Sequence, residues 1–98
     1  MVITKEITEE DIVCASVDQV STEVSGEAVI LNLEDGTYYG LNLVGARVWN
    51  LLKSPISVRE IEEALLEEYD VAQEVCHREL MALLGELASY GLIEVSNE

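Results

Sequence analysis

The first half of the chain alternates hydrophobic and polar residues in short runs that are typical of β-strands. Residues 20–24 alternate Val and Thr with Ser and Glu, residues 28–33 are almost wholly apolar, and residues 37–41 are rich in β-forming side chains. Ser25-Gly26 offers a turn between the first two runs. Asp35-Gly36 follows the second run, and this dipeptide suits the positive φ angles of a type I′ hairpin. The pattern predicts a three-stranded antiparallel meander.

The following residues change to a helical period and carry two clear helix starts. Asn42 is suited to cap a first helix, which Pro55 prevents from continuing. Ser57 with Glu60 three residues later forms the pattern of a capping box, which places the start of a second helix. The period of this helix predicts a solvated acidic face made of Glu62, Glu63, Glu67 and Glu68.

A third helix is expected from Asp70, with Gln73 three residues on, to about Tyr90, and Gly91 is expected to end it in a left-handed conformation. Its hydrophobic stripe is wide, because the apolar positions cover about half of the helix circumference. Such a stripe fits a helix packed on several sides, and it also fits a helix that lines a groove. The stripe consists of Cys76, Leu80, Met81, Leu83, Leu84, Leu87 and Ala88.

These elements define an α+β fold in which a three-stranded antiparallel meander is followed by three helices, an order similar to a winged helix-turn-helix. The length of 98 residues fits one domain. We assign residues 20–95 to this domain. Residues 1–19 form an N-terminal segment without a secure assignment, in which Ile12-Val13-Cys14 is compatible with a short strand.

The charge of the chain excludes several classes of partner. Twenty acidic residues against five Lys and Arg give a net charge of −15, which repels nucleic acid and anionic membranes. No apolar run is long enough to span a membrane, and the acidic N-terminus is unlike a signal peptide. Cys14 and Cys76 are far apart in the sequence, and free thiols in a reducing compartment explain them best. We therefore expect a cytoplasmic protein.

The sequence offers no convincing catalytic or cofactor site. His77 is the only histidine, and its neighbour Cys76 points about 100° away around the helix, so the two do not form a catalytic dyad. Two cysteines and one histidine leave a zinc ligand set incomplete. The glycines do not have the spacing of a phosphate-binding loop. We expect no enzyme activity, no metal and no cofactor.

The last predicted strand, residues 37–41, suggests a binding function. As the end of a meander it is an edge strand, yet it carries none of the lysine or proline that normally protects an edge. An open edge beside an apolar helix suits β-strand addition, in which an extended peptide pairs with the edge. Alternatively, the N-terminal segment, the tail around residues 92–95 or a second copy of the chain covers this edge. Tyr39 and Leu41 share one face of the strand, and Tyr38 lies on the other.

Four segments resemble a known family. They are Val29-Ile30-Leu31-Asn32-Leu33, Gly36-Thr37-Tyr38-Tyr39-Gly40-Leu41-Asn42, Gly45-Ala46-Arg47-Val48-Trp49, and the ending from Leu87 to Gly91-Leu92-Ile93. From about residue 20 to 95 the chain resembles the PqqD-like peptide-recognition proteins, or RiPP recognition elements. It is most similar to the free-standing members of lasso peptide biosynthesis.

The resemblance implies a non-catalytic adaptor that binds the leader of a ribosomally made precursor peptide as an added strand, between the third strand and the third helix. In the lasso members, the adaptor would present the precursor to a leader peptidase and then to a cyclase. The implied peptide-binding residues are Thr37, Tyr38, Tyr39, Gly40 and Leu41 on the strand and Cys76, Leu80, Met81 and Leu84 on the helix. Two other functions stay open, a winged-helix regulator that binds DNA and a structural adaptor that dimerises through its sheet edge.

Overall fold

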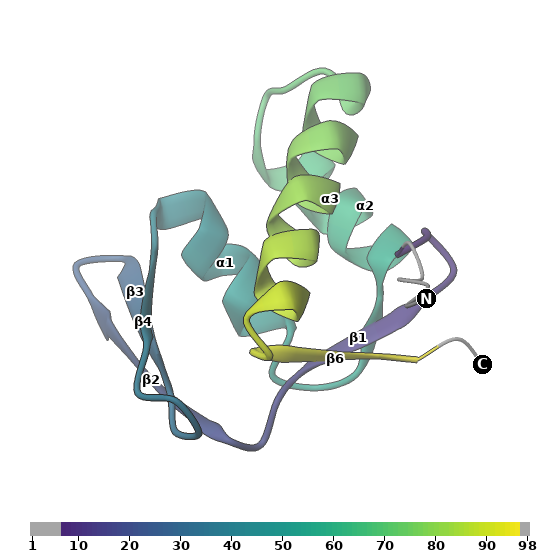
Figure 1. Ribbon diagram of the computed structural model, residues 1–98. Helices are drawn as coiled ribbons and strands as arrows, with labels where there is room; N and C mark the ends of the chain where they lie inside the picture. Colours follow the sequence, from purple (N-terminus) through teal and green to yellow (C-terminus); the bar gives the residue numbers. More distant parts are fainter. Residues whose placement is uncertain (1–6, 97–98) are drawn as a thin grey trace.

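The computed structural model describes residues 7–96 and contains six strands and three helices within that range (Figure 1). The elements in chain order are β1 (Ile12–Ala15), β2 (Gln19–Val24), β3 (Glu27–Asn32), β4 (Tyr38–Leu41), α1 (Leu43–Leu51), β5 (Ile56–Ser57), α2 (Val58–Glu68), α3 (Gln73–Ser89) and β6 (Ile93–Ser96). The predicted α+β class, with an antiparallel meander followed by three helices, is confirmed.

The meander has the strand order β2-β3-β4. Its first turn lies at Ser25-Gly26 as predicted, but its second turn differs from the prediction. Ser25 and Gly26 both have positive φ, 55° and 83°, as a two-residue type I′ turn requires. In the second turn Gly36 has a φ of 75°, while Asp35 is not among the positive-φ residues, so the expected type I′ turn is wrong. The Asp35 carboxylate instead accepts hydrogen bonds from the Thr37 backbone N–H (3.0 Å) and hydroxyl (2.7 Å), and these bonds stabilise a longer loop.

A second antiparallel sheet with the order β5-β1-β6 was not predicted. Its central strand, β1, comes from the N-terminal segment that the sequence left without a secure assignment. In β1, Val13 is fully buried and pairs with Ile56 of β5 on one side and Val95 of β6 on the other. The segment from Ile12 to Ala15 is thus part of the fold, while residues 1–6 lie outside the described residues.

The helix ends follow local capping chemistry, with one exception. The Asn42 side chain accepts a hydrogen bond from the Gly45 N–H (2.9 Å), and the capping box of Ser57 and Glu60 is formed. Gly91 follows α3 with a φ of 73°, as predicted. The predicted start at Asp70 is wrong, because α3 begins at Gln73 and its N-cap position is Ala72, which has no side-chain hydrogen bond to offer.

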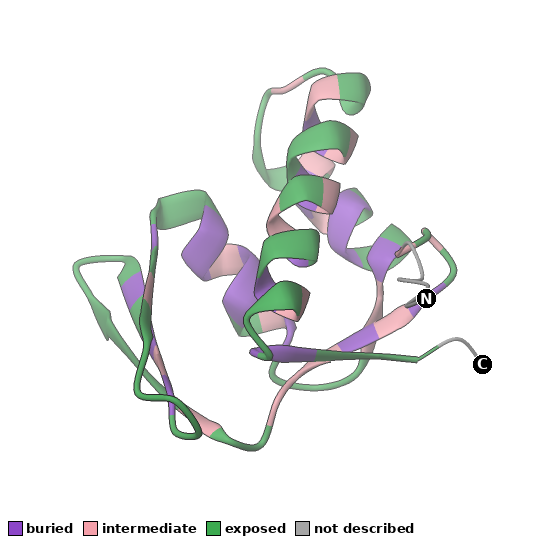
Figure 2. Cartoon of the chain, viewed as in Figure 1, coloured by how far each residue is buried: buried purple, intermediate pink, exposed green. Residues whose placement is uncertain are grey.

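The core lies where the helices meet the inner faces of the two sheets (Figure 2). Trp49 of α1 is 1% exposed, and its indole N–H donates to the hydroxyl of Ser21 on β2 (3.0 Å). The side-chain amide of Asn50 on α1 also donates to β2, to the carboxylate of Glu23 (2.9 Å). The polar face of β2 therefore points toward α1.

Candidate functional site

The outer edge of β4 has no strand partner in the described part of the chain. β4 pairs with β3 on one side only. The N-terminal segment and the C-terminal tail, two of the expected covers for this edge, instead pair with each other as β1 and β6. Within residues 7–96 the backbone groups along this edge are therefore available to another strand.

A groove of about 380 Å³ lies beside this edge. Its walls are β4 with the start of α1, the end of α2 with the residues that follow it, and the first half of α3. The lining residues are Tyr39, Gly40, Leu41, Asn42, Val44, Gly45, Val48, Leu65, Tyr69, Val71, Cys76, Glu79, Leu80 and Leu83. Most of these side chains are apolar, so the groove is suited to hydrophobic side chains of a ligand.

The structure brings five of the nine predicted site residues together in this groove. They are Tyr39, Gly40, Leu41, Cys76 and Leu80. Tyr38 is 73% exposed and lies on the opposite face of β4, as the strand alternation predicted. Thr37 precedes the strand, is exposed, and does not line the groove.

The other two predicted residues, Met81 and Leu84, do not line this groove. Leu84 is fully buried in the core, and Met81 packs against the core from the other flank of α3. Glu79 and Leu83 take their place in the lining. The wide apolar stripe contained Leu83, but periodicity alone does not say which flank of a helix faces a cavity.

The start of α1 supplies further lining residues that the sequence analysis did not assign to the site. Gly45 lies on the first turn, and a Cβ added there would be 3.0 Å from a Leu41 side-chain carbon, so α1 approaches β4 closely. Val44, one position before Gly45, and Val48, one turn after Val44, also line the groove. These residues follow the predicted strand closely in the sequence, and a helix that starts directly after an edge strand borders the same groove. Their position in the sequence could therefore have assigned them to the site.

Tyr39 of β4 and Glu86 of α3 form a direct contact between the strand and the helix. The Tyr39 hydroxyl donates to the Glu86 carboxylate, and the Tyr39 ring packs against the ring of Tyr90 with centroids 5.3 Å apart. Burial, the hydrogen bond to Glu86 and the charge of Glu86 raise the pKa of Tyr39 to about 12. These contacts hold β4 close to the C-terminal end of α3.

The groove carries little charge, and that charge is negative. Glu79 is the one carboxylate among the lining residues, and the lining contains no Lys, Arg or His. Burial first, and then the charges of Glu62 and Glu79, raise the pKa of the Cys76 thiol. A thiol of raised pKa with no histidine beside it in the groove is a poor nucleophile.

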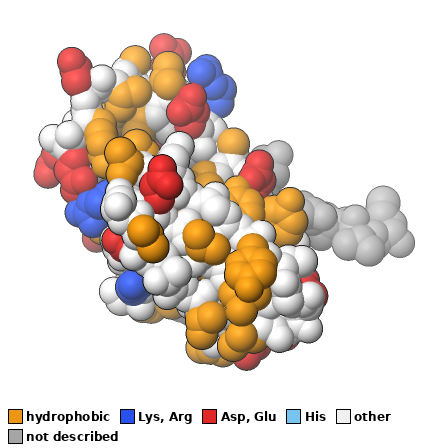
Figure 3. Space-filling model, turned by 90° about the vertical axis from the view of Figure 1, so that its left-hand side faces the viewer, with side chains coloured by type: hydrophobic (Ala, Val, Ile, Leu, Met, Phe, Trp, Pro, Cys, Tyr) orange, Lys and Arg blue, Asp and Glu red, His pale blue; other side chains and the backbone are white. Residues whose placement is uncertain are grey.

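The outward face of the meander is also apolar. Val20, Val24, Val29 and Tyr38 are all exposed on the side away from α1. Figure 3 views the molecule from this side, and hydrophobic side chains gather in patches there. The open edge of β4 therefore borders apolar surface on both faces of the sheet.

A small α+β module with an open strand edge beside an apolar groove is typical of peptide-binding proteins. The chain belongs to the PqqD family, since the model of coenzyme PQQ synthesis protein D (PqqD) matches residues 27–93.

Two solved structures are similar to this chain. A structure of TbiB1 in complex with the TbiA(beta) leader peptide is 38% identical, with a TM-score of 0.78, over 83% of this chain and 94% of that one. A structure of lasso peptide synthetase B1 complexed with the leader peptide shares the fold at 22% identity, with a TM-score of 0.73, over 84% of this chain and 96% of that one. No curated protein sequence gives a significant match. Within residues 7–96, none of the helices has the length and apolar character needed to cross a membrane.

Proposed function

We propose that this protein is a non-catalytic adaptor that binds the leader segment of a ribosomally made precursor peptide, of the lasso type, as an added strand on β4. The single observation that carries the proposal is the unpaired edge of β4 directly beside the groove. The peptide backbone pairs with β4, and alternate side chains of the peptide enter the groove toward α3.

Both parts of this site are needed for useful affinity. About four backbone hydrogen bonds at roughly 0.5 to 1.5 kcal/mol each supply about 2 to 6 kcal/mol, whereas a micromolar complex needs about 8 kcal/mol. The apolar lining, including Leu80 and Leu83, must supply the remainder by burying ligand side chains.

The similarity to TbiB1 supports the choice of ligand. That protein is 38% identical to this chain and is in complex with a leader peptide. We further propose that the bound precursor is presented to a separate leader peptidase and a cyclase in the cytoplasm. The free thiols of Cys14 and Cys76 and the lack of a nucleophile–base pair among the groove residues are consistent with this role.

A titration with matched variants on the two flanks of α3 tests the proposal. The probe is a labelled peptide with the leader sequence encoded by the short open reading frame beside the gene, measured by fluorescence anisotropy. Leu83 and Met81 are both half-buried, but only Leu83 lines the groove. Leu83→Asn should raise the Kd about tenfold or more, and Met81→Asn should leave it within about twofold.

Two parallel measurements address the other functions. Duplex DNA replaces the peptide in one, and sedimentation velocity measures the mass in the other. Saturable binding of DNA, or a dimer that forms without peptide and fails to bind it, would contradict the adaptor function.

Hydrogen exchange of the β4 amides tests strand addition itself. Asn32 N–H donates to Thr37 O (2.9 Å), so the alternation of an antiparallel ladder directs the backbone groups of Tyr39 and Leu41 toward β3 and those of Tyr38 and Gly40 toward the open edge. Saturating peptide should slow exchange at Tyr38 and Gly40 and leave the already bonded Tyr39 and Leu41 amides nearly unchanged. Tight binding without new protection at Tyr38 and Gly40 would exclude strand addition while preserving the binding function.

A further inference from the structure

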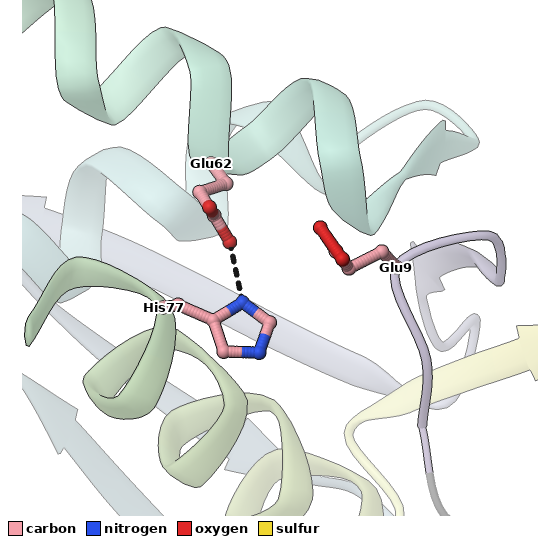
Figure 4. Close-up of side chains that lie close together, drawn as sticks. All are labelled: Glu9, Glu62 and His77. Carbon is pink, nitrogen blue, oxygen red and sulfur yellow. Dashed lines mark hydrogen bonds and ion pairs between the residues drawn. The ribbon is translucent and has the colours of Figure 1, made fainter. Parts of the chain in front are cut away.

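Three potential metal ligands converge on the far side of α3 from β4 (Figure 4). Glu62 comes from α2, His77 from the start of α3, and Glu9 from the residues before β1. One ligand atom from each residue lies within 4.8 Å of the other two. His77 Nδ1 is 2.7 Å from a Glu62 carboxylate oxygen. These residues belong to no part of the groove described above.

The burial of Glu62 needs an explanation, because the helical period predicted it on the solvated face of α2. Its side chain is only 5% exposed, and in the described chain no Lys or Arg forms an ion pair with it. Its partners are His77 and, at 3.5 Å, the amide of Gln73. A buried carboxylate is stable only when it is paired with a cation or coordinates a metal.

The carboxylate of Glu9 adds a second negative charge near Glu62. A backbone hydrogen bond from Arg59 N–H to Glu9 O (3.1 Å) holds its segment against the start of α2. The Arg59 guanidinium is 3.8 Å from Glu9 and pairs more closely with Glu10, so Glu9 is only partly neutralised. Two carboxylates thus lie near each other and near one imidazole, which contacts only Glu62.

We propose that Glu9, Glu62 and His77 bind a divalent transition metal ion, for which Zn²⁺ is the natural probe. One imidazole nitrogen and two carboxylate oxygens form a ligand set that suits Zn²⁺, and the remaining position would hold water. Zn²⁺ bonds of about 2.0 to 2.2 Å place ligand atoms about 3 to 4 Å apart. The ion would therefore bind once the 2.7 Å pair of His77 and Glu62 opens slightly and the Glu9 side chain rotates inward. Counting only Cys and His in the sequence missed this set, because two of its three ligands are glutamates.

Metal binding would have a structural consequence for α3. The start of this helix has no side-chain cap, and the proposed ion would tie its second turn to α2 and to the residues before β1. The groove residues Cys76 and Glu79 flank His77 along the same helix. The ion would therefore stabilise the wall of the groove without touching a ligand in it.

The test is a titration of the chelator-treated full-length protein with Zn²⁺ by calorimetry and with Co²⁺ by visible absorption. We expect one ion per chain and a rise in Tm when Zn²⁺ is added. His77→Gln and Glu62→Gln should each weaken binding at least tenfold, and Glu9→Gln, at a half-exposed position, tests the site in a variant whose folding does not depend on a buried charge.

Two controls separate this site from other ways of binding metal. Glu63→Gln removes an equal charge from the exposed position next to Glu62 and should leave affinity unchanged. Cys14→Ser with Cys76→Ser removes both thiols and should also leave it unchanged. Any of three results would overturn the proposal. Binding could be lost when the thiols are removed, it could be unaffected by both His77→Gln and Glu9→Gln, or it could be absent at stoichiometric Zn²⁺.

Discussion

Tyr39 acts on both sides of the groove, since its backbone belongs to β4 and its side chain contacts α3. Its ring packs against Tyr90 and its hydroxyl donates to Glu86. The neighbouring Tyr38, only one position away, is 73% exposed and touches neither. The pleat of a strand thus gives two adjacent tyrosines different roles, one in joining strand to helix and one on the open face.

The pKa of Tyr39 provides a direct check of this contact. The folded state holds the phenolic proton up to a pKa of about 12, above the ordinary value of 10.0. The contribution of this group to the free energy of unfolding is therefore full below pH 10 and is lost as the pH rises toward about 12. Ultraviolet titration should show a late-ionising tyrosine that disappears in Tyr39→Phe and ionises earlier in Glu86→Gln. If Tyr39→Phe removed a tyrosine that ionises near pH 10, or if Glu86→Gln left the curve unchanged, the contact would be absent in solution.

Single residues were predictable where their role is local. Asn42, Ser57 and Gly91 were assigned correctly, because a cap or a turn is decided by a few neighbouring residues. Glu62 was not, because its burial depends on a partner fifteen positions away on another helix. For the same reason the sequence named Tyr39 and Cys76 as groove residues but could not choose between the two flanks of α3.

At the level of elements, α3 is the helix with the weakest start. α1 and α2 begin with Asn42 and Ser57, whose side chains accept hydrogen bonds from the first turn. α3 begins after Ala72, which leaves the N–H groups of its first turn without such a partner. This helix also provides one wall of the groove, so its stability bears directly on the site.

Ala72→Ser should therefore stabilise the protein. Ala72 already has the extended backbone of an N-cap, with φ −66° and ψ 141°, so serine can add the missing hydrogen bond without a change of conformation. We expect a gain of about 0.5 to 1 kcal/mol in the free energy of unfolding, measured by urea denaturation. Ala82→Ser, on the exposed middle of the same helix, is the control and should give no gain. Equal effects at both positions would argue against the capping explanation.

The predicted and the missed elements differ in how far apart their partners lie in the sequence. The meander joins consecutive strands through short turns, and the helices carry their own period, so both leave a local signal. β1, β5 and β6 are short and pair across long separations, which no local pattern encodes. The sequence therefore predicts a possible strand at Ile12-Val13-Cys14 but not the partners that make it part of a second sheet.

At the scale of the whole molecule, one sheet brings together the first and last described strands, β1 and β6, with β5 from the middle of the chain. β1 leads directly toward β2 of the meander, and it also lies between β5 and the last strand, β6 (Figure 1). The N-terminal segment thus contributes to the core through Val13, which is 0% exposed.

Two valines of this segment provide a matched test. Val13→Ala should lower the free energy of unfolding by roughly 1 to 3 kcal/mol, because it leaves a cavity in the core. Val17→Ala, at a side chain that is 83% exposed, should change it by less than about 0.5 kcal/mol. Chemical denaturation of both variants gives the comparison. A Val13→Ala variant as stable as the native protein would mean that β1 is not part of the cooperative unit.

The pairing of Ala15 with Ile93 also bears on the order of folding. Closing this contact joins residues separated by most of the chain, and the entropy of loop closure makes such long-range pairs slow to form. The meander and the helices can assemble from neighbouring segments first. On the ribosome, the sheet around β1 cannot be completed until β6 has left the exit tunnel, so the first of the described strands waits for the last of them.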